Sequence, residues 1–381
     1  MAMRKIAVMV AQGSGHTSGV MRGIAQYAVA HGPWEFTVQF PGLSLMAIRE
    51  WKVDGVIVPV RSGEYSHVLR GRAFKVVNCS GMLKDAGVPT VRVNDAAVGR
   101  LAAEHLLERG FRQFGFVGFE PYDFSAARRE SFAEAVRGAG GEFHPYEPDP
   151  ALATEWTWER QEADLARWLG RLPKPAGVFA ANDDRAWHVA EACRRIGLRS
   201  PEEVAILGVD NDDLRCEFSC PPLSSVAVPA ERIGYEAAAL LDRLMKGEPE
   251  PAGPVFIEPQ GVAMRRSTDT LAVSDDDVRQ AFRYIREHAG EPLKAVGVAE
   301  AVGVSVPTLA RKFRDLLGRT LKEELQRTHL RRAERILAET DLALPKVAHA
   351  AGFKAPSRFH TLLRRETGLT PRAYREKFRM R

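Results

Sequence analysis

Residues 344–375 read LPKVAHAAGFKAPSRFHTLLRRETGLTPRAYR, and this stretch decides the fold of the C-terminal part of the chain. Apolar residues recur at helical spacing on both sides of Ala351-Gly352-Phe353, where glycine permits a turn through positive φ. About fifty residues earlier, Val302-Gly303-Val304-Ser305 also separates two predicted helices, and Ser305 is a predicted N-cap. A short helix, a glycine turn and a second helix form a helix-turn-helix unit. The sequence therefore predicts two such units.

The whole sequence after residue 275, on both sides of these turns, has apolar residues at the spacing of helices. Ser274 is a predicted N-cap, with Asp277 at the third helical position. We expect an all-α domain over residues 277–381, preceded by a linker over residues 267–276. Its predicted helices cover residues 276–288, 293–301, 305–317, 321–339, 344–350, 355–367 and 371–379.

Charge is distributed unevenly along the 381 residues. Residues 275–381 hold 23 basic and 14 acidic side chains, a net charge of +9, whereas the remaining residues hold 31 and 35, a net charge of −4. Positive charge at one end of a chain favours a polyanionic partner for that end. A solvated basic surface is the alternative, and charge alone does not choose between the two.

The second helix-turn-helix unit resembles the AraC/XylS family of DNA-binding domains. Its motif is Ala348-x-x-Ala351-Gly352-Phe353, followed by Ser357-Arg358-Phe359, Arg364-Arg365, Gly368-x-Thr370-Pro371 and Tyr374-Arg375. Leu363 stands where the family usually has Phe, and we expect it in the core. The resemblance implies that the second helix of each unit contacts bases through Pro307, Thr308 and Arg311, and through Pro356, Ser357, His360 and Thr361. Arg311 can pair with guanine O6 and N7, or it contacts a phosphate instead.

The first 265 residues alternate apolar strands with helices. Continuous apolar strands between helices are typical of parallel sheets that are covered on both faces. This length exceeds one small doubly wound domain, so we expect an α/β domain of two doubly wound lobes over residues 1–266. The predicted strands are 6–10, 55–60, 75–78, 114–118, 177–181 and 204–209, and the helices 19–31, 96–109, 125–139, 159–172 and 185–196.

Sequence motifs of common enzymes are missing from this α/β region. Gly13-Ser14-Gly15 lacks the third glycine of a dinucleotide fingerprint, and no P-loop, G-x-S-x-G or H-E-x-x-H motif occurs. The spacing of the four cysteines fits no zinc site, so we expect reduced thiols and no cofactor or metal. Asp183-Asp184 and Asp210–Asp213 leave two interpretations open: metal or acid–base chemistry, or the binding of sugar hydroxyls.

Three segments of the α/β region resemble the type I periplasmic-binding fold of LacI/GalR regulators. They are Gly177–Asp183, Ile206–Asp212 and Leu223–Val226. The resemblance implies a ligand in the crevice between the lobes, at the carboxyl ends of the strands. Carboxylates and a guanidinium can pair with the hydroxyls of a sugar, and an aromatic ring can pack on its apolar face. The implied ligand-binding residues are His16, Phe119, Arg128, Asn182, Asp183 and Asp210, and further aromatic candidates are Tyr122, Phe124, Trp158 and Trp187.

In XylR-like regulators, a ligand-sensing domain is followed by an AraC-type DNA-binding domain. The chain resembles these regulators over nearly its whole length. The resemblance implies a homodimeric transcription regulator that is not an enzyme. It implies double-stranded operator DNA, a xylose-like effector and RNA polymerase as partners, and it favours activation. Two alternatives stay open: a constitutive regulator whose N-terminal domain only dimerises, and a sugar-processing enzyme fused to a DNA reader. No run of eighteen apolar residues occurs and residues 6–10 are too short for a signal peptide, so we expect a cytoplasmic protein without a membrane partner.

Overall fold

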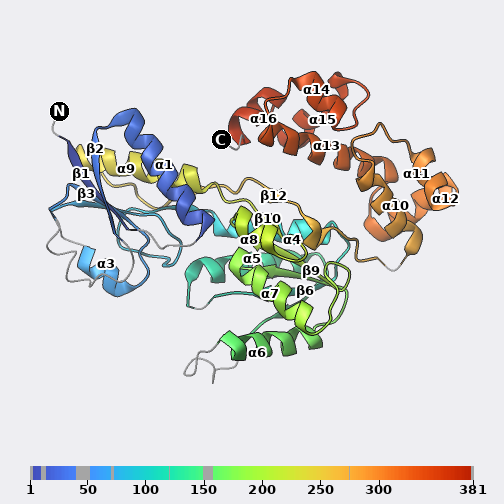
Figure 1. Ribbon diagram of the computed structural model, residues 1–381, viewed down its shortest axis with the longest axis horizontal. Helices are drawn as coiled ribbons and strands as arrows, with labels where there is room; N and C mark the ends of the chain where they lie inside the picture. The colour runs from blue at the N-terminus through green and yellow to red at the C-terminus, as the bar shows by residue number, and fades with distance from the viewer. Residues whose placement is uncertain are drawn as a thin grey trace. The chain divides into compact units, whose positions relative to one another are not determined.

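A computed structural model describes residues 3–378 apart from 10–13, 40–51, 70–72, 120, 149–157 and 274 (Figure 1). The chain forms two compact units. One contains Met1–Leu107 and Phe111–Asp269, and the other contains Glu108–Gly110 and Thr270–Arg381. No helix among the described residues is long and apolar enough to span a bilayer.

The first lobe of the larger unit is built on a four-stranded parallel sheet in the order β2-β1-β3-β4. Helices α1 and α9 pack together on one face, and α3 covers the other (Figure 1). Gly23 allows the close approach of α1 and α9, because a Cβ there would lie 1.8 Å from the carbonyl oxygen of Glu231. The elements are β1 (Arg4–Met9), α1 (Gly15–His31), β2 (Trp34–Gln39), β3 (Gly55–Val58), α3 (Gly63–Leu69), β4 (Lys75–Asn78) and α9 (Ala230–Met245).

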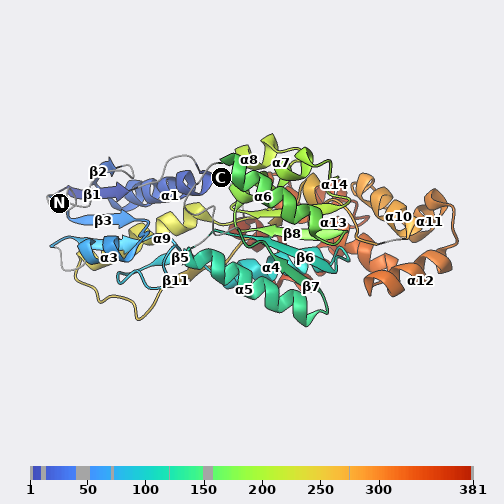
Figure 2. The ribbon, with the colours of Figure 1, turned by 90° about the horizontal axis from the view of Figure 1, so that it is seen from below.

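The second lobe has a six-stranded sheet in the order β12-β10-β9-β8-β6-β7, parallel except for β12. Helices α4 and α5 lie on one face, and α6 and α7 on the other (Figure 2). Strands β5 (Val91–Val93) and β11 (Val255–Ile257) form a separate parallel pair. The remaining elements are α4 (Asp95–Leu107), β6 (Gln113–Val117), α5 (Asp123–Gly138), β7 (Glu142–Pro145), α6 (Trp158–Arg171), β8 (Ala176–Ala180), α7 (Asp183–Arg195), β9 (Val204–Val209), α8 (Asp213–Phe218), β10 (Ser224–Val226) and β12 (Val262–Ala263).

The smaller unit is helical and has two apolar cores joined by α13 (Leu321–Glu339). Leu321 and Leu325 of α13 belong to the first core, and Leu330, Ala333 and Leu337 belong to the second. Thr320 and Glu323 form a capping box at its N-terminus. The other helices are α10 (Asp276–Glu287), α11 (Ala295–Val302), α12 (Val306–Leu317), α14 (Leu344–Ala350), α15 (Pro356–Thr367) and α16 (Pro371–Phe378).

The predicted fold class is confirmed: two doubly wound lobes precede a helical domain with two helix-turn-helix units. Leu363 is fully buried in the second helical core, as expected. Ser274 lies outside the described residues, and the N-cap of α10 is Asp275, whose carboxylate accepts from the Val278 N–H at 3.1 Å. In the segment predicted as a linker, Ser267 is buried in the larger unit, where its hydroxyl donates to the carbonyl oxygen of Ile206 at 2.6 Å.

Candidate functional site

Asp210 follows β9 and presents a carboxylate that no described residue hydrogen-bonds. Its φ is 107° and that of Asn211 is 53°, values that non-glycine residues adopt at a cost of roughly 1–3 kcal/mol each. The strand β10 holds this turn, because the Asp210 N–H donates to Val226 O at 3.0 Å and the Asn211 N–H donates to the Ser225 hydroxyl at 2.9 Å. The strained backbone therefore fixes the position of an acceptor group that receives no hydrogen bond from the described residues.

His16 lies opposite Asp210, with its Nδ1 at 3.8 Å from the Asp210 carboxylate. This imidazole nitrogen is buried and has no hydrogen-bond partner within the described chain. Burial raises the pKa of Asp210, and the charges of His16 and Arg128 oppose the rise. Three of the residues predicted from the sequence are thus brought into one electrostatic cluster between the lobes.

Arg128, on α5, is buried and held in place by Asp95. Its Nε donates to the Asp95 carboxylate at 2.8 Å, its Nη1 donates to the carbonyl oxygen of Ala181, and its guanidinium lies 5.0 Å from the centre of the Phe124 ring. Burial raises the pKa of Asp95, and Arg128 and Arg92 lower it. Asp95 was not predicted from the sequence, because the three-residue strand β5 that precedes it was not predicted either.

Asp183 lies at the first position of α7 and is only 2% exposed. One carboxylate oxygen accepts from the Ser225 hydroxyl at 2.6 Å, and the other accepts from the Asp212 N–H at 2.8 Å. Burial, together with the neighbouring charge of Asp210, raises its pKa to about 8. Both oxygens therefore help to hold β10 and the loop after β9 in place.

Asn182 and Phe119 are also placed at the carboxyl edge of the second sheet. The Asn182 side chain caps α7 by accepting from the Arg185 N–H at 2.9 Å, which leaves its amide nitrogen to donate elsewhere. One face of the Phe119 ring is covered by the guanidinium of Arg185, 4.2 Å from the ring centre.

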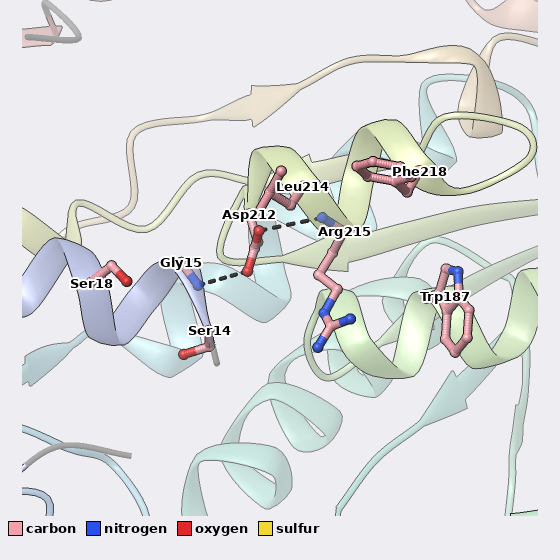
Figure 3. A pocket seen from close by; sticks show the side chains of 8 residues that line it. All are labelled: Ser14, Gly15, Ser18, Trp187, Asp212, Leu214, Arg215 and Phe218. Carbon is pink, nitrogen blue, oxygen red and sulfur yellow. Dashed lines mark hydrogen bonds between the residues drawn. The ribbon is translucent and has the colours of Figure 1, made fainter. Parts of the chain in front are cut away.

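A pocket of about 500 Å³ lies between α1, α7 and α8 (Figure 3). Asp212 joins the two lobes there: one carboxylate oxygen accepts from the Gly15 N–H at 2.6 Å, and the other accepts from the Arg215 N–H at 3.3 Å. A Cβ on Gly15 would lie 2.9 Å from the Asp212 carboxyl carbon, so this approach requires glycine. The candidate aromatic Trp187 borders the pocket, whereas the six predicted ligand-binding residues do not. The lining residues are Ser14, Gly15, Ser18, Trp187, Asp212, Leu214, Arg215 and Phe218.

The first helix-turn-helix unit consists of α11 and α12 around Gly303, whose φ is 78°. The Ser305 hydroxyl caps α12 by accepting from the Thr308 N–H at 3.2 Å, and it also hydrogen-bonds the Thr308 hydroxyl at 2.8 Å. Leu309 and Phe313 bury the opposite face of α12. Pro307 and Arg311 are exposed, and Arg311 has no ion pair among the described residues.

The second unit consists of α14 and α15 around Gly352, whose φ is 80°. A Cβ at Gly352 would lie 2.6 Å from the Glu291 carbonyl oxygen, so glycine is required here for space as well as for φ. Phe359 and Leu363, both on α15, are buried. Among the predicted base-contacting residues, Pro356 is half-buried, whereas the other three are exposed: Ser357, His360 and Thr361.

Comparison with known proteins gives the same two-part organisation. Residues 103–268 match a periplasmic binding protein-like domain, and residues 298–377 match a helix-turn-helix domain. The chain is 28% identical over 380 residues to a xylose operon regulatory protein of Haemophilus influenzae, covering 97% of this chain and 98% of that one. It is 28% identical over 369 residues to its Escherichia coli counterpart, covering 94% and 93%.

Solved structures extend this likeness to three dimensions. The solved structure of the xylose-binding transcription activator XylR is 27% identical in sequence to this chain, and the match covers 100% of both chains with a TM-score of 0.64. A complex of the regulator CelR with cellobiose shares the fold over 70% of this chain and 85% of its own, with 24% identity and a TM-score of 0.59. The similarity to XylR includes both the α/β part and the helix-turn-helix part.

Proposed function

We propose that this chain, a sugar-responsive DNA-binding transcription regulator of the XylR-like type, binds a pentose such as xylose between the lobes of its α/β unit. The observation that carries the proposal is the Asp210 carboxylate, held by a strained turn beside Nδ1 of His16; neither group hydrogen-bonds another of the residues that the structure describes. The similarity over 97% of the chain to a xylose operon regulatory protein supports the choice of sugar.

Each group near Asp210 has a chemical function toward a polyol. The Asp210 carboxylate accepts hydrogen bonds from sugar hydroxyls, and the Asn182 amide and the Arg128 guanidinium donate to sugar oxygens. Asp95 fixes the plane of Arg128, because it accepts from Nε and so limits rotation of the side chain. The free face of Phe119 packs on the C–H face of the sugar ring. Asp183 positions the loop of Asp210 and does not contact the sugar.

For DNA, we place α12 and α15 in successive major grooves, with α13 as the rigid connection between them. Arg311 pairs with a guanine, since its exposed guanidinium has two parallel donors for O6 and N7. The second unit offers hydroxyl, imidazole and apolar contacts, so we assign a larger share of its specificity to DNA shape.

Arg265 gives a physical route from the effector to the segment that leads out of the α/β unit. Its guanidinium donates to the Asn211 side chain at 2.8 Å and to the carbonyl oxygen of Leu223 at 3.1 Å. A sugar that moves the Asp210–Asn211 turn therefore moves Arg265 as well. We propose that this movement changes the spacing of the helix-turn-helix units in a homodimer and promotes contact with RNA polymerase, which makes the protein an activator.

Calorimetry and operator-binding assays on the full chain test the proposal. Wild type and the matched control Glu217→Gln, an exposed acid on α8, should bind xylose equally well. Asp210→Asn should lose about tenfold to hundredfold in sugar affinity while still binding operator DNA without sugar. Equal sugar affinity in all three proteins would refute the cleft assignment. Failure of every pentose and hexose to raise Tm would favour a constitutive regulator, and release of a sugar product would indicate an enzyme.

A further inference from the structure

Arg185 has a partly buried guanidinium that makes no hydrogen bond to any residue the structure describes. Its Nε is buried and has no hydrogen bond, and the part of the chain that the structure describes supplies no ion pair to the side chain. The guanidinium stacks on the Phe119 ring, whose centre lies 4.2 Å from the guanidinium carbon. Burial lowers the pKa of Arg185, and the nearby Tyr146 and Asp184 oppose this.

The groups that could pair with Arg185 are engaged elsewhere. Asp184 forms an ion pair with Arg215 at 2.8 Å, and the Tyr146 hydroxyl donates to Asp164 at 2.9 Å. Arginine stays charged in proteins, and burying one of its N–H donors without an acceptor is costly. A folded chain tolerates such a group where a ligand completes its hydrogen bonds.

The position of Arg185 is that of a ligand-binding residue. Arg185 follows β8, Phe119 follows β6 and Tyr146 follows β7, and these three strands are neighbours in the sheet. All three residues thus lie at the carboxyl edge of the parallel sheet, where open α/β folds bind their ligands. The Arg185 N–H also donates to the Asn182 side chain, one of the predicted ligand-binding groups.

We propose that Arg185 is a further effector-contacting residue, which donates hydrogen bonds to an acceptor oxygen of the bound sugar. The Phe119 ring fixes the plane of the guanidinium, so its donors point to one place in the site. The acceptor is a hydroxyl or ring oxygen of a neutral pentose, or the carboxylate of the corresponding sugar acid. This inference rests on the proposed function, because it requires that a sugar binds at this edge of the sheet.

Calorimetric titration of the full chain with D-xylose and with D-xylonate tests the inference. Arg185→Met should weaken binding of at least one of them by about tenfold to hundredfold, since a hydrogen bond to a charged group is lost. Weaker binding of both ligands identifies a contact with a hydroxyl or ring oxygen. Weaker binding of xylonate alone identifies a contact with its carboxylate. The matched control is Arg194→Met, an exposed arginine on the same helix that pairs with Glu191.

Thermal unfolding separates this function from a structural one. Because no polar group of the described chain depends on Arg185, the Tm of Arg185→Met should be unchanged or higher than that of wild type. Arg185→Lys keeps the charge but loses the planar donor set, and it should show an intermediate affinity. Unchanged affinity in Arg185→Met, or a fall in Tm without a change in affinity for folded protein, overturns the inference. If wild type binds neither sugar, the proposed function fails; if it binds and only Asp210→Asn weakens binding, the inference alone fails.

Discussion

The α/β unit and the helical unit hold their functional polar side chains in opposite ways. In the α/β unit, Arg128, Asp95 and Asp183 are each at most 5% exposed, and hydrogen bonds within the protein orient them. In the helical unit, Arg311 and His360 are exposed on helices whose opposite faces are packed. A substitution in the first group therefore changes folding and ligand binding together. A substitution in the second group should change DNA binding and leave stability almost unaltered.

The largest effect should follow from Asp95→Ala, which leaves the Arg128 guanidinium buried without its carboxylate. Removing one partner of a buried ion pair typically costs about 3–5 kcal/mol of stability. Thermal and urea unfolding should show this loss, and sugar affinity should fall because Arg128 is no longer oriented. Glu134→Ala, an exposed acid on the same helix as Arg128, is the control. Wild-type stability in Asp95→Ala would mean that the pair contributes little and that the contrast between the units is weaker than stated.

The pH dependence of stability should reveal Asp183. Its pKa is raised from 3.8 to about 8 in the folded protein, so the folded state keeps a proton that the unfolded state releases. Stability from this group is complete below pH 4 and falls as pH rises toward 8, because the unfolded chain then gains by ionising. We expect Tm to fall between pH 5 and pH 8, and to fall less in Asp183→Asn. Parallel Tm curves for the two proteins would contradict this.

Arg311→Ala should weaken operator binding by about 1–3 kcal/mol without changing Tm. The exposed side chain has no ion pair with any residue that the structure describes, so we assign the effect to the contact with DNA. Fluorescence anisotropy with operator DNA and with random DNA of equal length measures it. If affinity for both DNAs falls equally, and the slope of log K against log salt concentration falls in magnitude by about one, Arg311 contacts a phosphate.

Most of the fold could be predicted from the sequence because central strands and packed helices leave continuous apolar patterns. Strand β9 and helix α13 have the predicted bounds of Val204–Val209 and Leu321–Glu339. Strand β2 was not predicted, because an edge strand with exposed Phe36 and Val38 has no continuous buried run. Helix α9 was also missed, although its buried Ile233, Ala237, Leu240, Leu241 and Leu244 have helical spacing.

The candidate site was less predictable because it depends on contacts between distant segments. Asp183 follows a strand just as Asp210 does, and the sequence gives no reason to treat the two differently. The difference arises from Ser225 and the Asp212 N–H, which engage both oxygens of Asp183. In the same way, Asp95 meets Arg128 only because α4 and α5 pack together.

Asp212→Ala should have an effect of about 0.5–2 kcal/mol, since it removes the side-chain cap of α8 and the hydrogen bond to the Gly15 N–H. We expect the arrangement of the lobes in which Asp212 reaches Gly15 to be less populated, so the apparent sugar affinity should fall roughly three- to tenfold. Calorimetry measures this against Glu217→Ala. Gly15→Ala should give the same result by a different route, because the added methyl group displaces Asp212. Unchanged affinity in both variants would show that this contact does not hold the lobes closed.

The smallest effects should come from the N-caps of α12 and α15, the two helices that we place in the major grooves. These caps allow the two helix-turn-helix units to be compared with each other. Ser305 caps α12 through its hydroxyl, whereas Ala355 at the start of α15 has no side-chain cap. Ser305→Ala should therefore cost about 0.5–2 kcal/mol, and Ala355→Ser should stabilise the protein by up to about 1 kcal/mol. Urea unfolding of the full chain, followed by far-UV circular dichroism and compared with wild type, measures both changes. Because a fixed N-terminus also fixes the exposed residues of the first turn, Ala355→Ser should at the same time narrow the range of DNA sequences that α15 accepts. A stabilised variant with unaltered sequence preference would show that α15 is ordered on DNA without a cap.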